Sequence, residues 1–155
     1  MVYVDSSALI KRYIDEIGTD KFNIRLAEAV RAEDPILTSL LSYAEIHAAL
    51  ARKLKDRLLR VTEYHWAAAR FESDWRTYLT RVELNQIVLA LVPYLVKKHP
   101  LKAADAIQLA SALWAVRAIQ TGGTQRPLVF ATSDKQLAGA AEYEQFEVFN
   151  PTAKA

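Results

Sequence analysis

Short apolar runs that are each followed by a helical pattern are the feature that most restricts the fold of this chain. Val2–Val4 is a β-branched and aromatic run that leads into Asp5 and then into a segment with apolar residues at helical spacing. The run at 128–131 is typical of a buried parallel strand and precedes Ser133 and a helical pattern at 134–141. Strands that alternate with helices indicate a parallel sheet covered by helices on both faces. We therefore predict a three-layer α/β/α fold with a mostly parallel central sheet.

Caps, periodicity and chain breakers predict the remaining elements. In chain order these are a helix from 19 to before Pro35, a strand at 36–37, a helix from 39 or 42 to about 59, a helix from 62, a strand at 82–84, a helix from 85 to about 99, a helix at 102–118 and a strand at 146–149. The expected helix caps are Ser6 or Ser7, Thr19, Ser39 or Ser42, Thr62, Asn85 and Ser133. Pro93 should kink its helix, and a buried strand at 87–92 is the alternative for that segment.

The composition indicates an ordinary globular protein of about one domain, since the chain has 155 residues. Its 20 basic and 18 acidic residues give a net charge of +2, which permits contact with nucleic acid without requiring it. The lack of cysteine excludes disulfides and thiolate metal sites. The N-terminus has no signal-peptide pattern, and the apolar stretch at 87–96 is shorter than the ~20 residues that span a bilayer. We expect a cytoplasmic protein without a membrane segment.

Four carboxylates stand where an apolar run meets a helical pattern: Asp5, Glu45, Asp105 and Asp134. In open parallel α/β sheets, ligands bind outside the carboxyl ends of the strands, where helix N-termini point inward. Asp5 and Asp134 follow predicted strands, and the other two acids lie near the starts of their helices. We therefore expect all four to meet at one edge of the sheet. Two like charges about 4 Å apart repel by ~4 kcal/mol at an effective dielectric of about 20, so a cation should lie among them.

Carboxylate ligands without His or Cys partners are typical of Mg²⁺ or Mn²⁺ sites. Such an ion polarises a phosphate oxygen, activates bound water and offsets charge on the leaving oxygen, which is the chemistry of phosphodiester hydrolysis. Each acid alone also has a structural explanation, namely capping for Asp5, solvent exposure for Glu45, and the helix dipole for Asp105 and Asp134. The functional hypothesis therefore depends on the four in combination.

The segments around the acids read VYVDSSALIKRY, SYAEIHAAL, LKAADAIQLASAL and VFATSDKQLAGAA, and the last is followed by VFNP. In this order, over nearly the full length, the chain resembles the PIN-domain family and, within it, the small VapC-type toxins of toxin–antitoxin pairs. The resemblance implies a nuclease domain at 1–150 with a short tail at 151–155. It also implies Mg²⁺- or Mn²⁺-dependent endoribonuclease activity, with the four acids as metal ligands and catalytic residues. RNA, a cognate antitoxin and a second copy of the chain are the implied partners.

Residues near the acids supply further candidates. Thr132 matches a family position whose hydroxyl could hold a metal-bound water or the neighbouring carboxylate, although a strand end also explains it. Candidates for contact with RNA phosphates are Lys11, Arg12, Lys102 and Lys135. The basic run at 52–60 is explained more simply by the preference for cations at a helix C-terminus.

The aromatic residues predicted to be core, or to line a groove for an antitoxin helix, are Trp66, Phe71, Trp75 and Tyr78.

Two other functions stay open at the level of sequence. Asp5 could be the nucleophile or phosphoacceptor of an aspartyl-phosphate phosphatase or receiver-like protein, but Ser7 stands where a phosphatase motif has its second aspartate. The other alternative is a catalytically silent RNA- or protein-binding module. Such a module need not keep four mutually repelling carboxylates together.

Overall fold

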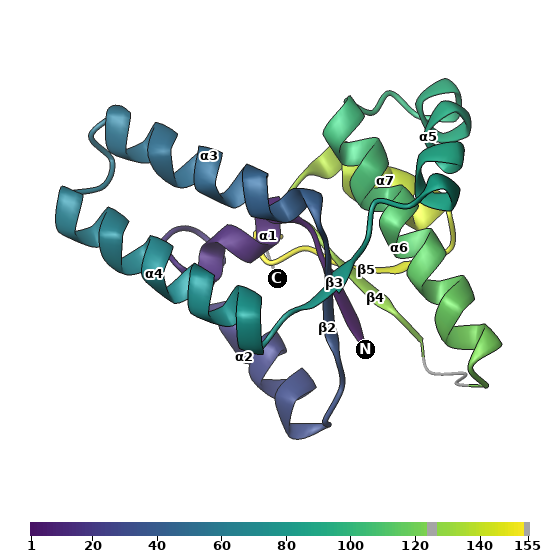
Figure 1. Cartoon of the computed structure of the whole chain (residues 1–155), viewed down its shortest axis with the longest axis horizontal. Coiled ribbons are helices and arrows are strands. Elements are labelled where there is room, and N and C mark those ends of the chain that lie inside the picture. The colour runs from purple at the N-terminus through teal and green to yellow at the C-terminus, as the bar shows by residue number, and fades with distance from the viewer. Residues whose placement is uncertain (124–126, 154–155) are drawn as a thin grey trace.

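A computed structural model describes residues 1–123 and 127–153 of the chain. Among these residues, five strands form one sheet: β1 (Val2–Val4), β2 (Ile36–Ser39), β3 (Thr80–Val82), β4 (Val129–Ala131) and β5 (Glu147–Phe149). Their order is β3-β2-β1-β4-β5, and every neighbouring pair is parallel (Figure 1). The predicted parallel sheet is therefore confirmed, and the carboxyl ends of its strands share one edge.

Helices cover both faces of the sheet (Figure 1). One face carries α1 (Ser6–Leu9), the 3₁₀ turn η1 (Ile10–Arg12), α2 (Thr19–Arg31), α3 (Leu41–Lys55) and α4 (Val61–Thr77). The opposite face carries α5 (Gln86–Lys98), α6 (Ala103–Thr121) and α7 (Lys135–Tyr143). Alternate side chains of β1 serve the two cores, because Val2 and Val4 pack in the first and Tyr3 in the second. The three-layer prediction is confirmed. None of the helices in the described ranges is both long and apolar enough to cross a membrane.

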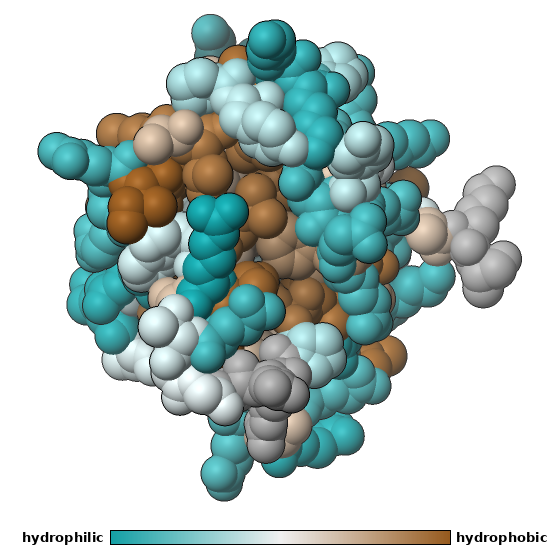
Figure 2. All heavy atoms as spheres, turned by 90° about the vertical axis from the view of Figure 1, so that its right-hand side faces the viewer, coloured by the Kyte–Doolittle hydropathy of each residue, from teal (hydrophilic) through white to brown (hydrophobic). Residues whose placement is uncertain are grey.

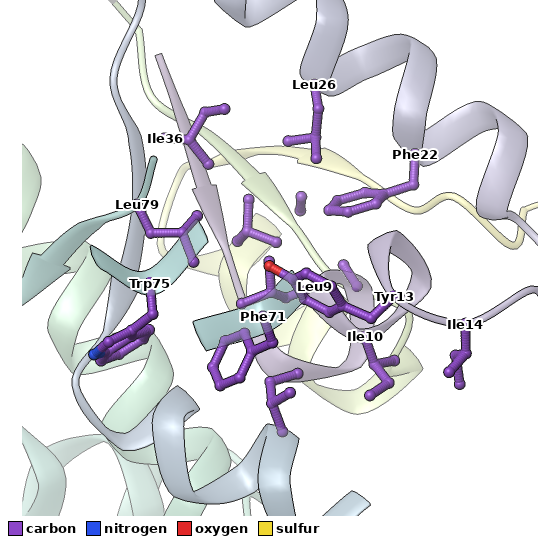
Figure 3. Packing of buried hydrophobic residues seen from close by; sticks show 14 of the residues in the cluster. Leu9, Ile10, Tyr13, Ile14, Phe22, Leu26, Ile36, Phe71, Trp75 and Leu79 are labelled. Atoms are coloured by element: carbon purple, nitrogen blue, oxygen red, sulfur yellow. The ribbon is translucent and has the colours of Figure 1, made fainter. Parts of the chain in front are cut away.

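Aromatic residues of α4 lie at the centre of the first core (Figure 3). Phe71 is fully buried and Trp75 is nearly so, and both pack in one cluster with Tyr13 and with Phe22 of α2. The ring centroids of Tyr13 and Phe71 are 5.3 Å apart in an edge-to-face arrangement, which is a favourable aromatic geometry. The predicted core role is confirmed for Phe71 and Trp75, whereas Trp66 is 59% exposed.

Several helix caps differ from the predicted ones by one or two residues. Asp5 caps α1, which confirms the structural explanation given for it and not the alternative caps Ser6 or Ser7. The other residues that precede the helices, each with the predicted cap that it replaces, are Gly18 (Thr19), Leu40 (Ser39 or Ser42), Arg60 (Thr62) and Asp134 (Ser133). In α1 and α7 the cap is an aspartate next to a serine. Both residue types accept hydrogen bonds from helix N–H groups, so local sequence does not decide between them.

The segment after β3 is a helix, as predicted. Asn85 caps α5 by accepting hydrogen bonds from the backbone N–H groups of Ile87 at 2.9 Å and Val88 at 3.0 Å. The alternative strand at 87–92 is therefore wrong. β3 starts at Thr80, two residues before the predicted strand, because it pairs in register with Leu37 to Ser39 of β2.

The C-terminal residues lie against the loop that precedes α2. Pro151 is buried, and Lys21 Nζ donates to the carbonyl oxygen of Ala153 at 2.8 Å. Gly18 has a φ of +92°, and a Cβ there would lie 2.7 Å from the carbonyl oxygen of Pro151. Glycine is thus required at this position both by its backbone conformation and by the close approach.

Candidate functional site

The carboxyl edge of the sheet carries the four predicted acids. Asp5 directly follows β1, Asp134 comes shortly after β4, Asp105 lies in the first turn of α6, and Glu45 lies one turn into α3. The pKa of Asp105 is raised first by its partial burial and then by the negative charges of Asp134 and Glu45. The structure therefore brings these three acids near one another, and Asp5 adjoins them through the contacts described next.

Asp5 is the buried member of the set, with only 3% of its surface exposed. Its carboxylate accepts hydrogen bonds from the backbone N–H of Ala8 at 2.9 Å, from Ser7 Oγ at 2.9 Å and from Thr132 Oγ1 at 3.1 Å. These bonds favour the charged form, but burial outweighs them and raises the pKa of Asp5 to about 7. Over the described ranges, no Lys, Arg or His forms an ion pair with this carboxylate. Within the described part of the chain, Asp5 is therefore a buried acid without a cationic partner.

Two hydroxyl groups connect Asp5 to the start of α7. Thr132 Oγ1 donates to Asp5 Oδ2 and accepts from the backbone N–H of Asp134, both at 3.1 Å. Ser7 Oγ donates to Asp5 and accepts from the backbone N–H of Ser133 at 2.9 Å. Thr132 therefore holds the carboxylate of Asp5 and the backbone of Asp134.

Glu45 is held by donors from α1 and α6. Ser6 Oγ donates to Glu45 Oε2 at 2.6 Å, and Gln108 Nε2 donates to the same oxygen at 2.7 Å. Sequence reasoning missed Gln108. The available signal was its position three residues after Asp105, which places both on one side of a helix rich in Ala and Leu.

Asp134 has a structural role in addition to its place in the site. Its Oδ1 accepts hydrogen bonds from the backbone N–H groups of Gln136 at 2.8 Å and Leu137 at 2.9 Å, which caps α7. Capping uses one oxygen of the carboxylate. Asp134 therefore caps α7 through Oδ1, a role that the sequence assigned to Ser133, and capping does not exclude a second role for its other oxygen.

The donor set suits a hard cation, although a ligand cage is not already assembled. In residues 1–123 and 127–153, no three His, Cys, Asp or Glu side chains lie close enough together to hold a metal ion as they stand. The carboxylate and hydroxyl oxygens are nevertheless the donors that Mg²⁺ and Mn²⁺ prefer, and Mg²⁺ keeps several waters and uses few direct carboxylates. Asp5 and Asp105, whose pKa values are raised, would gain from a nearby positive charge.

Two of the cations predicted to contact RNA are already engaged in the fold. Lys11 is buried, and its Nζ lies 2.7 Å from Glu16 Oε1. Arg12 Nε lies 2.6 Å from Asp74 Oδ2, and the Arg12 guanidinium also lies over the ring of Tyr78. Both side chains are therefore paired with acids of the fold, and their contact with RNA phosphates stays a prediction.

The other two predicted cations lie beside the acids. The charge of Lys102 lowers the pKa of Asp105, so the two side chains are near each other. Lys135 is exposed and is the first residue of α7, directly after Asp134. Lys102 and Lys135 therefore remain candidates for contact with a phosphate group at this edge.

Solved structures of toxin–antitoxin complexes share this fold. A toxin-antitoxin complex from Klebsiella pneumoniae aligns with a TM-score of 0.60 and 20% identity over 97% of this chain and 98% of that chain. VapBC2 from Rickettsia felis, bound to a DNA fragment from its promoter, aligns with a TM-score of 0.61 and 11% identity over 97% and 98%. This likeness shows that the chain has the same fold as the matched chains of these complexes.

Two curated ribonucleases of Mycobacterium tuberculosis are similar to the chain in sequence. VapC45 of strain CDC 1551 / Oshkosh and VapC49 of strain ATCC 25618 / H37Rv are each 37% identical over 115 residues, which is 73% of this chain and 75% of each relative. No protein-family model matches the chain. The identity over most of both lengths shows that the chain belongs to the VapC ribonuclease family.

Proposed function

We propose that this protein is a metal-dependent endoribonuclease and the toxin of a toxin–antitoxin pair. The observation that carries the proposal is that four carboxylates from distant segments lie at the same edge of the sheet, where the described residues offer buried Asp5 no cation. The relatives named ribonucleases, and the fold shared with toxin–antitoxin complexes, support it. Hydrolysis of RNA requires positive charge at the phosphate and an activated water, and both are supplied by a divalent ion.

The residues of the site divide into metal-binding acids and groups that orient them. Asp5, Glu45, Asp105 and Asp134 would bind Mg²⁺ or Mn²⁺, which polarises the phosphate and activates water when bound. Ser7 and Thr132 hold the carboxylate of Asp5, and Ser6 and Gln108 hold that of Glu45. Lys102 and Lys135, which lie beside the acids, would bind neighbouring phosphates of the RNA.

Removal of divalent metal tests the proposed function. Total RNA incubated with the protein and Mn²⁺ or Mg²⁺ should give discrete fragments, and EDTA should abolish them, because the four acids alone cannot neutralise a phosphate. Sequencing of the new RNA ends would identify the cleavage site, and excess Mn²⁺ should restore cleavage after EDTA. Cleavage that EDTA leaves undiminished would contradict metal dependence. Metal-independent RNA binding without scission would instead support the catalytically silent module.

The proposed antitoxin has a candidate groove near the turn between α3 and α4. A cavity of about 410 Å³ lies there, lined by Tyr13, Ile14, Asp15, Leu58, Leu59, Thr62, Glu63 and Trp66. Trp66 and Leu58 remain 59% and 69% exposed, so an apolar antitoxin segment would bury surface that the fold leaves in water. Among the described residues that line this cavity, Trp66 is the only tryptophan. An antitoxin that binds without changing the tryptophan fluorescence of the protein would contradict the assignment.

We also propose that the protein is a homodimer, with the second copy bound over α5. Hydrophobic residues gather on the face of the molecule that carries α5 and α6 (Figure 2). Four large hydrophobic residues of α5 are between 43% and 56% exposed, namely Ile87, Leu89, Tyr94 and Val96. Helical spacing places Ile87 and Tyr94 on one side of α5 and Leu89 and Val96 on the opposite side, and exposed apolar residues of this kind are candidates for burial against a partner.

The substitution Leu89→Glu is expected to shift the protein from dimer to monomer, because a dimer would have to bury an unpaired charge. Size-exclusion chromatography with light scattering measures the mass. Val30→Glu, on α2, is a matched control, since Val30 and Leu89 are both 49% exposed. A dimer that tolerates Leu89→Glu as well as Val30→Glu would contradict this interface.

A further inference from the structure

Gln108 joins the acidic edge to the interior of the sheet. It lies on α6 with only 2% of its surface exposed, one turn after Asp105. Its amide nitrogen contacts Glu45 Oε2 at 2.7 Å, Ser42 Oγ at 2.9 Å and Ser6 Oγ at 3.0 Å. Its amide oxygen accepts a hydrogen bond from the Tyr3 hydroxyl at 2.7 Å. One side chain therefore connects β1, α1, α3 and α6.

The surrounding groups determine which way the amide of Gln108 faces. The hydroxyl of Thr38 donates to the carbonyl oxygen of Val4 at 2.7 Å, so the Ser42 hydroxyl, 2.7 Å away, donates to Thr38. Ser42 Oγ can then accept a hydrogen from Gln108 Nε2. A reversed amide would place its oxygen against the carboxylate of Glu45, where two acceptors would repel. The Tyr3 hydroxyl donates to the opposite end of the amide and stabilises the same orientation.

The consequence for Glu45 is that its two oxygens are not equivalent. Oε2 accepts from both Gln108 and Ser6. Oε1 has no hydrogen-bond partner among the residues that the structure describes. The carboxylate is thus held through Oε2 alone by the described residues.

We propose that Gln108, oriented by Tyr3, is a positioning residue that fixes Glu45 through Oε2 and so presents Oε1 to the divalent ion. The inference rests on the proposed metal-dependent function. Groups that bond to a metal ligand restrict its orientation before the ion arrives, and their removal typically weakens metal binding or activity by about 10- to 100-fold. Tyr3 acts one step further away, since it contacts Gln108 and not the carboxylate.

The test is a double-mutant cycle on Mn²⁺ affinity, measured by calorimetry on the full chain without RNA. Gln108→Met keeps the length of the side chain but has no N–H to donate, and it should weaken Mn²⁺ binding by about 10- to 100-fold. Tyr3→Phe removes only the hydroxyl and should weaken binding by a smaller factor, about 3- to 10-fold. In the double variant, Tyr3→Phe should add nothing to the loss caused by Gln108→Met, because its effect passes through the same amide.

A control separates positioning from stability. Val88 is fully buried on α5, in the same core as α6, and has no bond to the acids. Val88→Ala should lower the unfolding temperature but leave the Mn²⁺ affinity unchanged. Addition of RNA should then show kcat lowered in Gln108→Met even at saturating Mn²⁺, and wild-type kcat in Val88→Ala.

The outcomes distinguish this inference from the function on which it rests. If the wild-type protein binds Mn²⁺ and cleaves RNA, and Gln108→Met binds Mn²⁺ equally well, the positioning role is overturned and the proposed function stands. If the losses of Mn²⁺ affinity in Gln108→Met and Tyr3→Phe add in the double variant, the two residues act independently, and the role assigned to Tyr3 is overturned. A wild-type protein that does not bind Mn²⁺ at all would overturn both.

Discussion

Replacement of both Asp5 and Asp105 by asparagine is expected to lower kcat/KM for metal-dependent RNA cleavage by at least ~10³-fold. The double variant keeps the shapes of the two side chains and loses two of the four negative charges that would hold the ion. A bound metal contributes several kcal/mol to the transition state. Loss of about 4 kcal/mol corresponds to a factor of ~10³ in rate, at about 1.36 kcal/mol for each tenfold change.

Asparagine is a suitable replacement because the fold should survive it. Asp5 caps α1, and asparagine caps helices about as well as aspartate. The control is the variant Asp20→Asn, Asp56→Asn, which makes the same change in net charge at two exposed positions. Cleavage rates are compared on an RNA that contains the mapped site, after circular dichroism has established folding. Undiminished cleavage by the Asp5, Asp105 variant would refute the proposed site.

The second large effect concerns the stability of the metal-free protein as a function of pH. Burial raises the pKa of Asp5 to about 7, so between about pH 4 and pH 7 the native state keeps a proton that the unfolded state releases. The stability linked to Asp5 is therefore complete below about pH 4 and is lost as the pH rises through about 7. Each pKa unit corresponds to about 1.4 kcal/mol, so the loss should be a few kcal/mol and at most about 4.

Denaturant unfolding in EDTA at a series of pH values measures this effect. Other acids contribute in the opposite direction at lower pH, because ion pairs or hydrogen bonds lower the pKa values of Glu16, Glu72 and Glu144. The difference between the wild-type protein and Asp5→Asn isolates Asp5, since asparagine does not titrate. We expect Asp5→Asn to be the more stable protein at about pH 8, by ~2 kcal/mol, and to lose this advantage near pH 4.

An exposed substitution provides the baseline for the pH series. Asp20→Asn makes the same substitution on the surface of α2, and its stability is measured over the same pH series. If the stability of Asp5→Asn follows the wild-type curve through neutral pH, Asp5 is not the buried, proton-binding acid that the structure describes.

Much of the candidate site could be predicted because its acids stand beside strong local signals. Asp5 and Asp134 follow buried strands, and in a parallel sheet the ends of such strands must meet at one edge. The cap of α7 was placed one residue away, on Ser133, because serine and aspartate satisfy the same helix N–H groups. Errors of this size did not move the acids from the edge of the sheet.

The sequence by itself determined the alternation of strands and helices, the parallel sheet and the four acids at its edge. Apolar periodicity and capping depend on residues within about one helical turn of each other, so they can be read along the chain. Tertiary structure alone decided that Lys11 pairs with Glu16, that Arg12 pairs with Asp74, and that Gln108 holds Glu45. Gln108 and its partner Tyr3 are 105 residues apart, and only the packing of α6 on the sheet brings them together. A hydrogen bond between such distant residues leaves no periodic pattern, because its geometry exists only after the layers have assembled.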